Sequence, residues 1–143
     1  MILPMDTPYF TFCQTLKQKN LSLTTPRKLI FQVLNTNEPL TIAEIIKACH
    51  GEIDRVTVYR TIELFEKLQI VQKLNIGWKY KIELSHPYQL HHHHMTCTRC
   101  HKIFALPEDE VLEARIKILA KSGSFTAIDH QIEIRGICQV CSV

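Results

Sequence analysis

The first half of the chain carries apolar residues at helical spacing, and the pattern predicts three helices. The first begins at residues 25–27, Thr-Pro-Arg, because proline suits the first helical turn, and it continues to Leu34. The second follows Thr41, a candidate N-cap, and ends at Gly51. The third begins after Asp54 and carries the apolar stripe Val58, Ile62, Phe65 and Leu68. Two helices joined by a short turn with glycine have the spacing of a helix-turn-helix motif.

Two short runs after these helices predict a β-hairpin. Residues 70–75 and 78–84 are joined around Ile76 and Gly77, and a hairpin in this place is the wing of a winged helix. The runs carry Lys73, Lys79 and Lys81, whose charges suit contacts with backbone phosphates.

The third predicted helix presents a distinctive set of outward residues near its start. These residues are Arg55, Thr57, Tyr59, Arg60 and Thr61. Such groups bind phosphates and base edges, and groove-reading residues lie at the start of a recognition helix. However, a charged helix face is usually only solvated, and three helices with a hairpin also serve protein–protein contacts. The pattern by itself leaves DNA binding and protein binding equally open.

The second half of the chain predicts a mixture of strands and a helix. We expect a strand at residues 91–96, a helix from Pro107 to Gly123 and a strand at residues 125–137. The helix has acidic residues in its first turn and lysines toward its end, which suits the helix dipole. Its residues Val111, Ala114 and Ile118 would face the sheet. The whole chain is therefore expected to have an α+β fold.

Charge and metal-binding residues are unevenly distributed, which predicts two domains. Residues 1–85 carry 11 Lys and Arg against 8 Asp and Glu, a net charge of +3, whereas residues 86–143 carry 6 of each. Seven of the 8 histidines and four of the 6 cysteines lie in the second part. We expect a winged helix-turn-helix domain at 1–85 and a small α/β domain at 86–143.

The sequence has no feature that directs it to a membrane. No apolar run approaches the ~20 residues that span a bilayer. The first residues, MILPMDTPYF, lack the basic region and long apolar stretch of a signal peptide. We therefore expect a cytoplasmic protein, in which thiols stay reduced and paired cysteines bind metal more often than they form disulfides.

Two cysteine pairs predict a structural zinc site. The pairs Cys97-x-x-Cys100 and Cys138-x-x-Cys141 can supply four thiolates to one tetrahedral zinc ion per chain. A domain of this size buries too little apolar surface to be stable without a metal, a partner chain or both. Cys13 and Cys49 lack such partners and are expected to be core residues.

The sequence HHHHMTCTRC places four histidines in one predicted strand. Side chains alternate between the two faces of a strand, so His91 and His93 share one face, and His92 and His94 share the other. The run therefore predicts two half-sites back to back. Glu113 and His130 can complete the first site, and Glu83, with His86 as a further candidate, can complete the second. Imidazole with carboxylate suits zinc, divalent iron or manganese.

These residues resemble the ferric uptake regulator superfamily of bacterial metal-sensing repressors over nearly the whole chain. Thr57-Val58-Tyr59-Arg60 matches the family's recognition-helix signature, and residues 25–27 match its early helix. The run 91–100 matches its His-rich strand with the first cysteine pair. Residues 113–115, His130 and residues 136–141 follow in family order.

The resemblance implies a fold, partners and a mechanism. It implies a winged helix, a hinge and an α/β dimerisation domain that form a homodimer on palindromic operator DNA. The DNA-binding residues would be Arg27, Arg55, Thr57, Tyr59 and Arg60. A regulatory metal would take Glu83, His92 and His94, and a second site would take His91, His93, Glu113 and His130. The strand alternation alone gives the same division of the histidines.

The resemblance leaves the sensed metal open. Iron sensors usually have Asp where this chain has His93, and the run 130–134 with the last cysteine pair is more similar to the zinc uptake regulators. Yet zinc members often have Cys at the place of Glu83 and Asp near Gln72. Iron members have a histidine near Pro39 and a glutamate near Ala105. We expect zinc, with iron as the first alternative and manganese or peroxide sensing after it.

Two other functional classes fit the sequence less well. A zinc hydrolase needs an open metal position, a general base and a cleft, but four thiolates saturate a zinc ion and no motif such as HExxH is present. We therefore expect no enzyme activity and no small-molecule substrate. A metal-dependent interaction module without DNA is disfavoured by the outward Arg55, Tyr59 and Arg60.

Overall fold

The computed structural model describes residues 7–36, 38–76, 79–89, 91–128 and 130–143. The chain divides into two compact units, Met1–Leu90 (unit 1) and His91–Val143 (unit 2). The sequence-based division at residue 85 lies before this boundary, because residues after it still pack in unit 1. Tyr88 is 5% exposed, and its hydroxyl oxygen lies 2.8 Å from that of Thr15.

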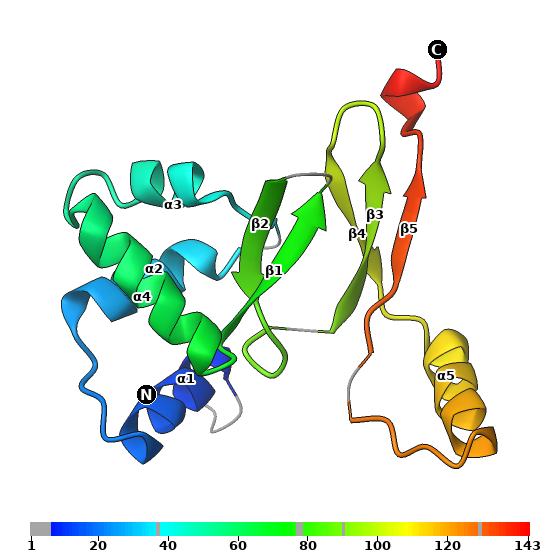
Figure 1. Cartoon of the computed structure of the whole chain (residues 1–143), viewed down its shortest axis with the longest axis horizontal. Coiled ribbons are helices and arrows are strands. Elements are labelled where there is room, and N and C mark those ends of the chain that lie inside the picture. The colour runs from blue at the N-terminus through cyan, green and yellow to red at the C-terminus, as the bar shows by residue number, and fades with distance from the viewer. Residues whose placement is uncertain (1–6, 37, 77–78, 90, 129) are drawn as a thin grey trace. The chain divides into compact units, whose positions relative to one another are not determined.

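Unit 1 contains helices and a two-stranded antiparallel sheet (Figure 1). The helices are α1 (Pro8–Gln18), α2 (Thr25–Leu34), α3 (Ile42–Ala48) and α4 (Arg55–Lys67), and the strands are β1 (Val71–Ile76) and β2 (Lys79–Leu84). The three predicted helices are confirmed as α2, α3 and α4. Helix α1 is an additional element that was not predicted, although Thr7 caps it, Pro8 opens it, and Phe12 and Leu16 have the spacing of a buried face.

Local capping explains where the helices of the predicted helix-turn-helix begin. Thr41 and Glu44 form a reciprocal capping box at the start of α3. Asp54 Oδ1 accepts a hydrogen bond from the Thr57 backbone N–H at the start of α4. Between the two helices, Gly51 has φ +76°, a conformation that glycine adopts without strain.

An apolar core holds unit 1 together. The rings of Phe12 and Phe31 stack with centroids 4.2 Å apart, and Phe65 meets Phe12 edge-on at 5.4 Å. Cys49 is fully buried in this cluster and Cys13 packs against it, so both are core residues, as predicted. The core extends into the hairpin through Ile82, which pairs with Leu40 by two backbone hydrogen bonds.

The hairpin has a defined register. Val71 pairs with Leu84, Gln72 with Glu83, and so on to Ile76 with Lys79. Two predictions lie partly outside the described residues, namely the turn around Ile76 and Gly77 and the strand start at Trp78. Lys73 lies on β1, and its Nζ is 2.8 Å from a carboxylate oxygen of Glu66 on α4.

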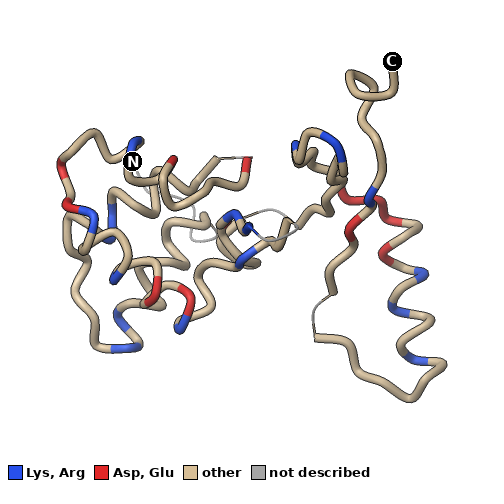
Figure 2. The backbone as a smooth tube through the Cα atoms, turned by 45° about the horizontal axis from the view of Figure 1, so that its top comes forward, with Lys and Arg blue, Asp and Glu red and all other residues tan. Residues whose placement is uncertain are grey.

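Unit 2 contains a three-stranded sheet in the order β4-β3-β5 and a helix, α5 (Figure 1). Its elements are β3 (His92–Cys97), β4 (Ile103–Pro107), α5 (Glu110–Ser122), β5 (Glu133–Gly136) and the 3-10 turn η1 (Gln139–Cys141). The central strand β3 runs antiparallel to β4 and parallel to β5. Figure 2 shows acidic residues at the start of α5 and basic residues farther along it, as predicted.

Three expectations for unit 2 are wrong. Pro107 ends β4 instead of opening the helix, because Asp109 caps α5 by accepting from the Leu112 N–H at 2.8 Å. The last strand is shorter than 125–137, because its pairing with β3 begins only where His94 N–H bonds to Ile132 O. His130 therefore precedes β5. Val111, Ala114 and Ile118 are exposed on α5, because the buried side of the helix carries Glu113.

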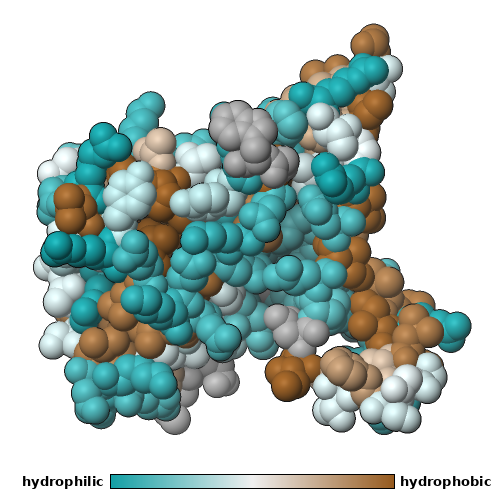
Figure 3. All heavy atoms as spheres, in the orientation of Figure 1, coloured by the Kyte–Doolittle hydropathy of each residue, from teal (hydrophilic) through white to brown (hydrophobic). Residues whose placement is uncertain are grey.

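Large apolar side chains of unit 2 face outward. Val111, Ile118 and Leu119 on α5 are 79%, 55% and 57% exposed, and Ile134 on β5 is 50% exposed. Figure 3 shows hydrophobic side chains gathered over α5 on the face in view. Among the described residues, no helix is long and apolar enough to cross a membrane.

Candidate metal centres and DNA-contacting residues

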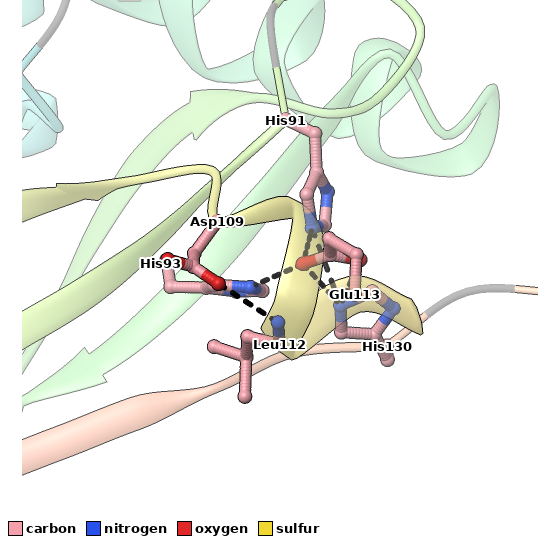
Figure 4. A network of polar contacts seen from close by, with 6 residues as sticks. All are labelled: His91, His93, Asp109, Leu112, Glu113 and His130. Atoms are coloured by element: carbon pink, nitrogen blue, oxygen red, sulfur yellow. Dashed lines mark hydrogen bonds and ion pairs between the residues drawn. The ribbon is translucent and has the colours of Figure 1, made fainter. Parts of the chain in front are cut away.

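One face of β3 holds a four-residue cluster within unit 2. His91, directly before the strand, and His93 lie with Glu113 of α5 and His130 of the segment before β5. Figure 4 shows the three imidazole rings turned toward the Glu113 carboxylate. The structure thus brings together the four residues assigned to the second metal site from the sequence.

The distances in this cluster test whether it suits a metal ion. The Nε2 atoms of His91 and His130 are 3.3 Å apart, and both lie 3.2–3.3 Å from Glu113 Oε1. A tetrahedral ion with bonds of about 2.0–2.1 Å has ligand atoms about 3.3–3.4 Å apart. His93 Nε2 is closer to Glu113 Oε1, at 2.8 Å. The donor atoms therefore fit one small divalent ion with little rearrangement.

The electrostatics of Glu113 also suit a metal ligand. Burial alone would raise the pKa of its carboxyl, but hydrogen bonds with His93 and His130 outweigh burial and lower that pKa. The group is therefore a carboxylate at neutral pH. His93 is 1% exposed, and within the described residues its Nδ1 atom has no hydrogen-bond partner. Its ring is thus held by packing and by the Glu113 contact.

The four cysteines of the two pairs also come together in unit 2. Cys97 ends β3, Cys100 follows it, and Cys138 and Cys141 flank the turn η1. Their sulfur atoms lie within 4.8 Å of one another, and those of Cys100 and Cys138 are 3.7 Å apart. Zinc–sulfur bonds of about 2.3 Å give a tetrahedron with edges of about 3.8 Å. The sulfur arrangement therefore fits zinc and excludes disulfides, whose sulfur atoms are about 2.05 Å apart.

The thiol pKa values show why this cluster suits a cation. Backbone N–H groups of Cys100 and Cys138 donate to Cys97 Sγ, and they lower the pKa of Cys97 to about 6. Hydrogen bonds with the side chains of Cys138 and Cys100 raise the pKa of Cys141 to about 12. Four thiolates this close repel one another, so a bound zinc ion would neutralise them and displace the remaining protons.

The residues assigned to the regulatory site belong to both units. In unit 2, His92 and His94 share the opposite face of β3, with ring centroids 4.7 Å apart. In unit 1, Glu83 lies on β2, is 3% exposed and accepts a hydrogen bond from Gln72. His86 is exposed. The assignment of Glu83, His92, His94 and His86 to one site remains a prediction.

The start of α4 divides the predicted DNA-binding residues into two groups. Arg55, Tyr59 and Arg60 are exposed, as expected for residues that contact DNA. Thr57 is half-buried, and its hydroxyl donates to Asp54 Oδ2 at 2.6 Å, so it is committed to the helix cap. Thr61, expected to point outward, is 7% exposed and lies on the core side of α4. The second bond of the cap, from the Thr57 hydroxyl, has no signal in the sequence.

Arg27 is half-buried on α2, and its guanidinium donates to the backbone carbonyl of Ser22. Gln72 stands near the place where zinc members of the family often have Asp, and its side chain donates a hydrogen bond to Glu83. The signal for that contact was the hairpin register, which the sequence left undefined.

Comparisons with known proteins agree across both units. The family model described as the ferric uptake regulator family matches residues 18–135. The ferric uptake regulation protein of Legionella pneumophila is 34% identical over 134 residues, which are 90% of this chain and 96% of that protein. The solved ferric uptake regulator of Vibrio cholerae has 29% identity and a TM-score of 0.68, over 87% of this chain and 98% of that one. The fold of the Helicobacter pylori ferric uptake regulator, which has three functional metal-binding sites, matches with a TM-score of 0.76 at 21% identity, over 95% and 92% of the chains.

Proposed function

Since this chain belongs to the ferric uptake regulator family of metal-dependent, DNA-binding transcriptional regulators, we propose that it represses metal-uptake genes as a metal-loaded homodimer. Members of the family are transcriptional regulators and not enzymes, and they bind operator DNA as dimers. The observation that carries the proposal is that metal-binding side chains line both faces of β3 in a chain whose α4 has an exposed basic start. Such a regulator would act in the cytoplasm.

We assign DNA contact to the exposed start of α4. Arg55 and Arg60 would bind phosphates or guanine edges, and Tyr59, 43% exposed, would pack against base edges in the major groove. Arg27 would add a phosphate contact from α2. Thr57 would hold the helix start in shape through Asp54.

The metal sites would have separate roles. Zinc held by Cys97, Cys100, Cys138 and Cys141 would be structural, because four thiolates leave no open position. The cluster of His91, His93, Glu113 and His130 lies wholly in unit 2, so a metal there would stabilise that unit. A regulatory metal on Glu83, His92 and His94 would link the two units and fix the spacing of the two recognition helices in a dimer.

We propose zinc as the sensed metal, with iron as the alternative. The sequence supports zinc, because the side chains of Pro39 and Ala105 carry no ligand atoms where iron members of the family have them, and the run 130–134 is more similar to the zinc uptake regulators. The names of relatives favour iron: the proteins from Legionella pneumophila and Bacillus subtilis, 34% and 31% identical, are ferric uptake regulation proteins.

Metal-dependent DNA selection tests the function and the metal together. Protein that retains only its structural zinc is offered random-sequence duplexes with Zn²⁺, Mn²⁺ or, without oxygen, Fe²⁺, and selected duplexes are tested by gel shift. Selection of a palindrome at the lowest free concentration of Zn²⁺ supports the proposal. Selection with Fe²⁺ at concentrations where Zn²⁺ is inactive moves the assignment to iron. Equal DNA binding without added metal would contradict metal-dependent repression.

A matched set of variants defines the regulatory ligands in the same assay. Glu83→Ala should abolish tight, metal-dependent binding to DNA. The effect of His86→Ala on the same binding shows whether His86 is a fourth ligand. Lys79→Ala, a change on the same strand as Glu83, is the control. It should leave the metal dependence unchanged.

A further inference from the structure

The side-chain amide of Gln72 contacts Glu83, the proposed regulatory ligand of unit 1. Gln72 on β1 and Glu83 on β2 are directly opposite in the antiparallel register. The Gln72 Nε2 group donates to Glu83 Oε1 at 2.6 Å. Residues opposite each other in a sheet share a face, so both side chains lie on the same side of the hairpin.

That side is opposite the hydrophobic core of unit 1. The neighbours of Glu83 on β2, Ile82 and Leu84, are fully buried in the core cluster, and strand alternation directs Glu83 the other way. Yet Glu83 is only 3% exposed, and a buried carboxylate requires hydrogen-bond donors or a cation. Gln72 supplies one such donor from within unit 1.

We propose that Gln72 is a positioning residue for Glu83, which it holds ready for the regulatory metal through one carboxylate oxygen. This inference rests on the proposed function of Glu83 as a regulatory ligand. Because the amide occupies one lone pair of Oε1, we expect the metal to bind Glu83 through Oε2. The orientation of the carboxylate is also fixed before the metal arrives, which favours binding because less freedom is lost.

The chemistry of an amide offers one competing arrangement. If Gln72 turned its carbonyl oxygen toward Glu83, two oxygens would face each other at the hairpin, and only a cation between them would make that favourable. Gln72 would then be a metal ligand itself. The two roles differ in a measurable way, because a positioning residue acts only through Glu83, whereas a ligand acts without it.

Cobalt titration of the zinc-containing full-length dimer measures the site directly. Co²⁺ added to protein with its structural zinc in place gives visible absorption, and the component that shifts to higher Co²⁺ concentration in Glu83→Ala defines the regulatory site. Gln72→Met keeps the length of the side chain and removes the donor. Asn75→Leu, an amide-to-apolar change on the other face of β1, is the matched control. Thermal unfolding without added Co²⁺ checks that each variant is folded.

The expected result is specific to this pair. Gln72→Met should weaken Co²⁺ at the regulatory site by about 10- to 100-fold and change the shape of its absorption bands, as loss of a hydrogen bond to a ligand typically does. Asn75→Leu should leave the titration unchanged. An unchanged titration in Gln72→Met overturns the proposal.

A double-mutant comparison separates positioning from direct ligation. In a Glu83→Ala background, Gln72→Met should cause no further loss of Co²⁺ affinity. A further loss of the same size as in the native background shows that Gln72 acts independently of Glu83 and overturns the positioning role. If Glu83→Ala alone leaves both the Co²⁺ spectrum and metal-dependent DNA binding intact, the regulatory assignment of Glu83 fails first, and the role of Gln72 fails with it.

Discussion

The two units bury opposite kinds of side chain. Unit 1 has a continuous cluster of buried apolar residues around three phenylalanines, Phe12, Phe31 and Phe65. In the described part of unit 2, the buried side chains are Cys97 and the polar residues His93, Thr96 and Glu113. Many of its large apolar residues are exposed, among them Val111, Ile118, Leu119 and Ile134. One unit is thus organised around hydrocarbon and the other around metal-binding groups.

This difference has consequences for folding. Unit 1 can gain its stability from apolar burial alone, because its core is complete within one chain. Unit 2 cannot, because its buried histidine, glutamate and cysteine favour folding only when a metal or hydrogen bonds satisfy them. Its exposed apolar residues on α5 and β5 form a surface suited to a second copy in the homodimer.

The largest expected effect is the loss of unit 2 when its zinc site is broken. Cys138→Ser should release one zinc per chain and abolish the dimer, while unit 1 retains its helices, because zinc binding at such sites supplies folding energy. Metal analysis, sedimentation and hydrogen exchange measure the three outcomes. Cys13→Ser, which alters a cysteine beside the core of unit 1, is the control and should keep its zinc. A metal-free dimer of Cys138→Ser would refute the structural assignment.

The next effect divides the histidines by strand face. His92→Ala and His94→Ala should behave like Glu83→Ala and abolish metal-dependent DNA binding, because their metal would link the two units. His91→Ala and His93→Ala should behave like Glu113→Ala and His130→Ala and mainly lower the stability of unit 2.

Metal stoichiometry, thermal unfolding and operator binding of these seven variants check the division. Variants of adjacent histidines should differ in these three measurements. Variants of residues that share a site should give the same result, although the residues come from separate elements. The two-face arrangement is wrong if His91→Ala and His92→Ala fall in one class, or if a single ion binds all four histidines.

A third prediction tests the role of the apolar surface of unit 2 in dimerisation separately from the role of its metals. Ile118→Asp places a charge on the exposed side of α5 and should weaken the dimer roughly 10- to 100-fold, as loss of a buried interface anchor does. Its zinc content should stay at the native value, since Ile118 is exposed on α5 and the four cysteines belong to other elements of the unit. Lys117→Asp, the neighbouring change on α5, is the control. Sedimentation over a range of protein concentrations gives the dimer Kd, and an unchanged Kd in Ile118→Asp would exclude this side of α5 from the interface.

Local signals in the sequence were sufficient for much of unit 1, for the grouping of the four cysteines and for the grouping of His91 with His93. Thr41 and Asp54 cap helices through bonds to residues three positions away, so their roles could be predicted without tertiary structure. The grouping of His91 with His93 needed only the alternation of a strand. The cysteine spacing predicted a cluster that the fold then assembled.

The features that were predicted wrongly or not at all have a common physical cause. Each of them depends on contacts with residues that are distant in sequence. The exposed side of α5 could not be predicted, because an apolar stripe on a helix looks the same whether its own sheet or a second chain covers it. The contact of Gln72 with Glu83 required the hairpin register, and the alternation of β1 and β2 does not define which residues are opposite. The end of β4 at Pro107 depended on pairing with His92.

A smaller effect concerns phosphate contacts of unit 1. Arg60→Ala should weaken binding to all duplexes and reduce the slope of log K against log salt by about one unit for the lost phosphate contact. The change should leave zinc content and dimerisation intact, because Arg60 is exposed on the unit with the apolar core. Fluorescence anisotropy at several salt concentrations measures the slope. Unchanged affinity in Arg60→Ala would count against α4 as the DNA-contacting helix.

The smallest expected effect distinguishes a capping residue from a base-reading one within the same turn. Thr57 donates its hydroxyl to Asp54 Oδ2 and its N–H to Oδ1, and these bonds lower the pKa of the Asp54 carboxyl. Because the folded pKa lies below the unfolded one, the cap stabilises unit 1 above the unfolded pKa and is lost as pH falls through the folded pKa. Thr57→Val should therefore have a lower free energy of unfolding than native protein at neutral pH. This difference in the free energy of unfolding should shrink in acid. Its preference among operator bases should change by less than about fivefold, below the discrimination that a direct base contact provides. Tyr59→Ala is the comparison, and a larger loss of base preference in Thr57→Val than in Tyr59→Ala would show that the hydroxyl leaves the cap to read DNA.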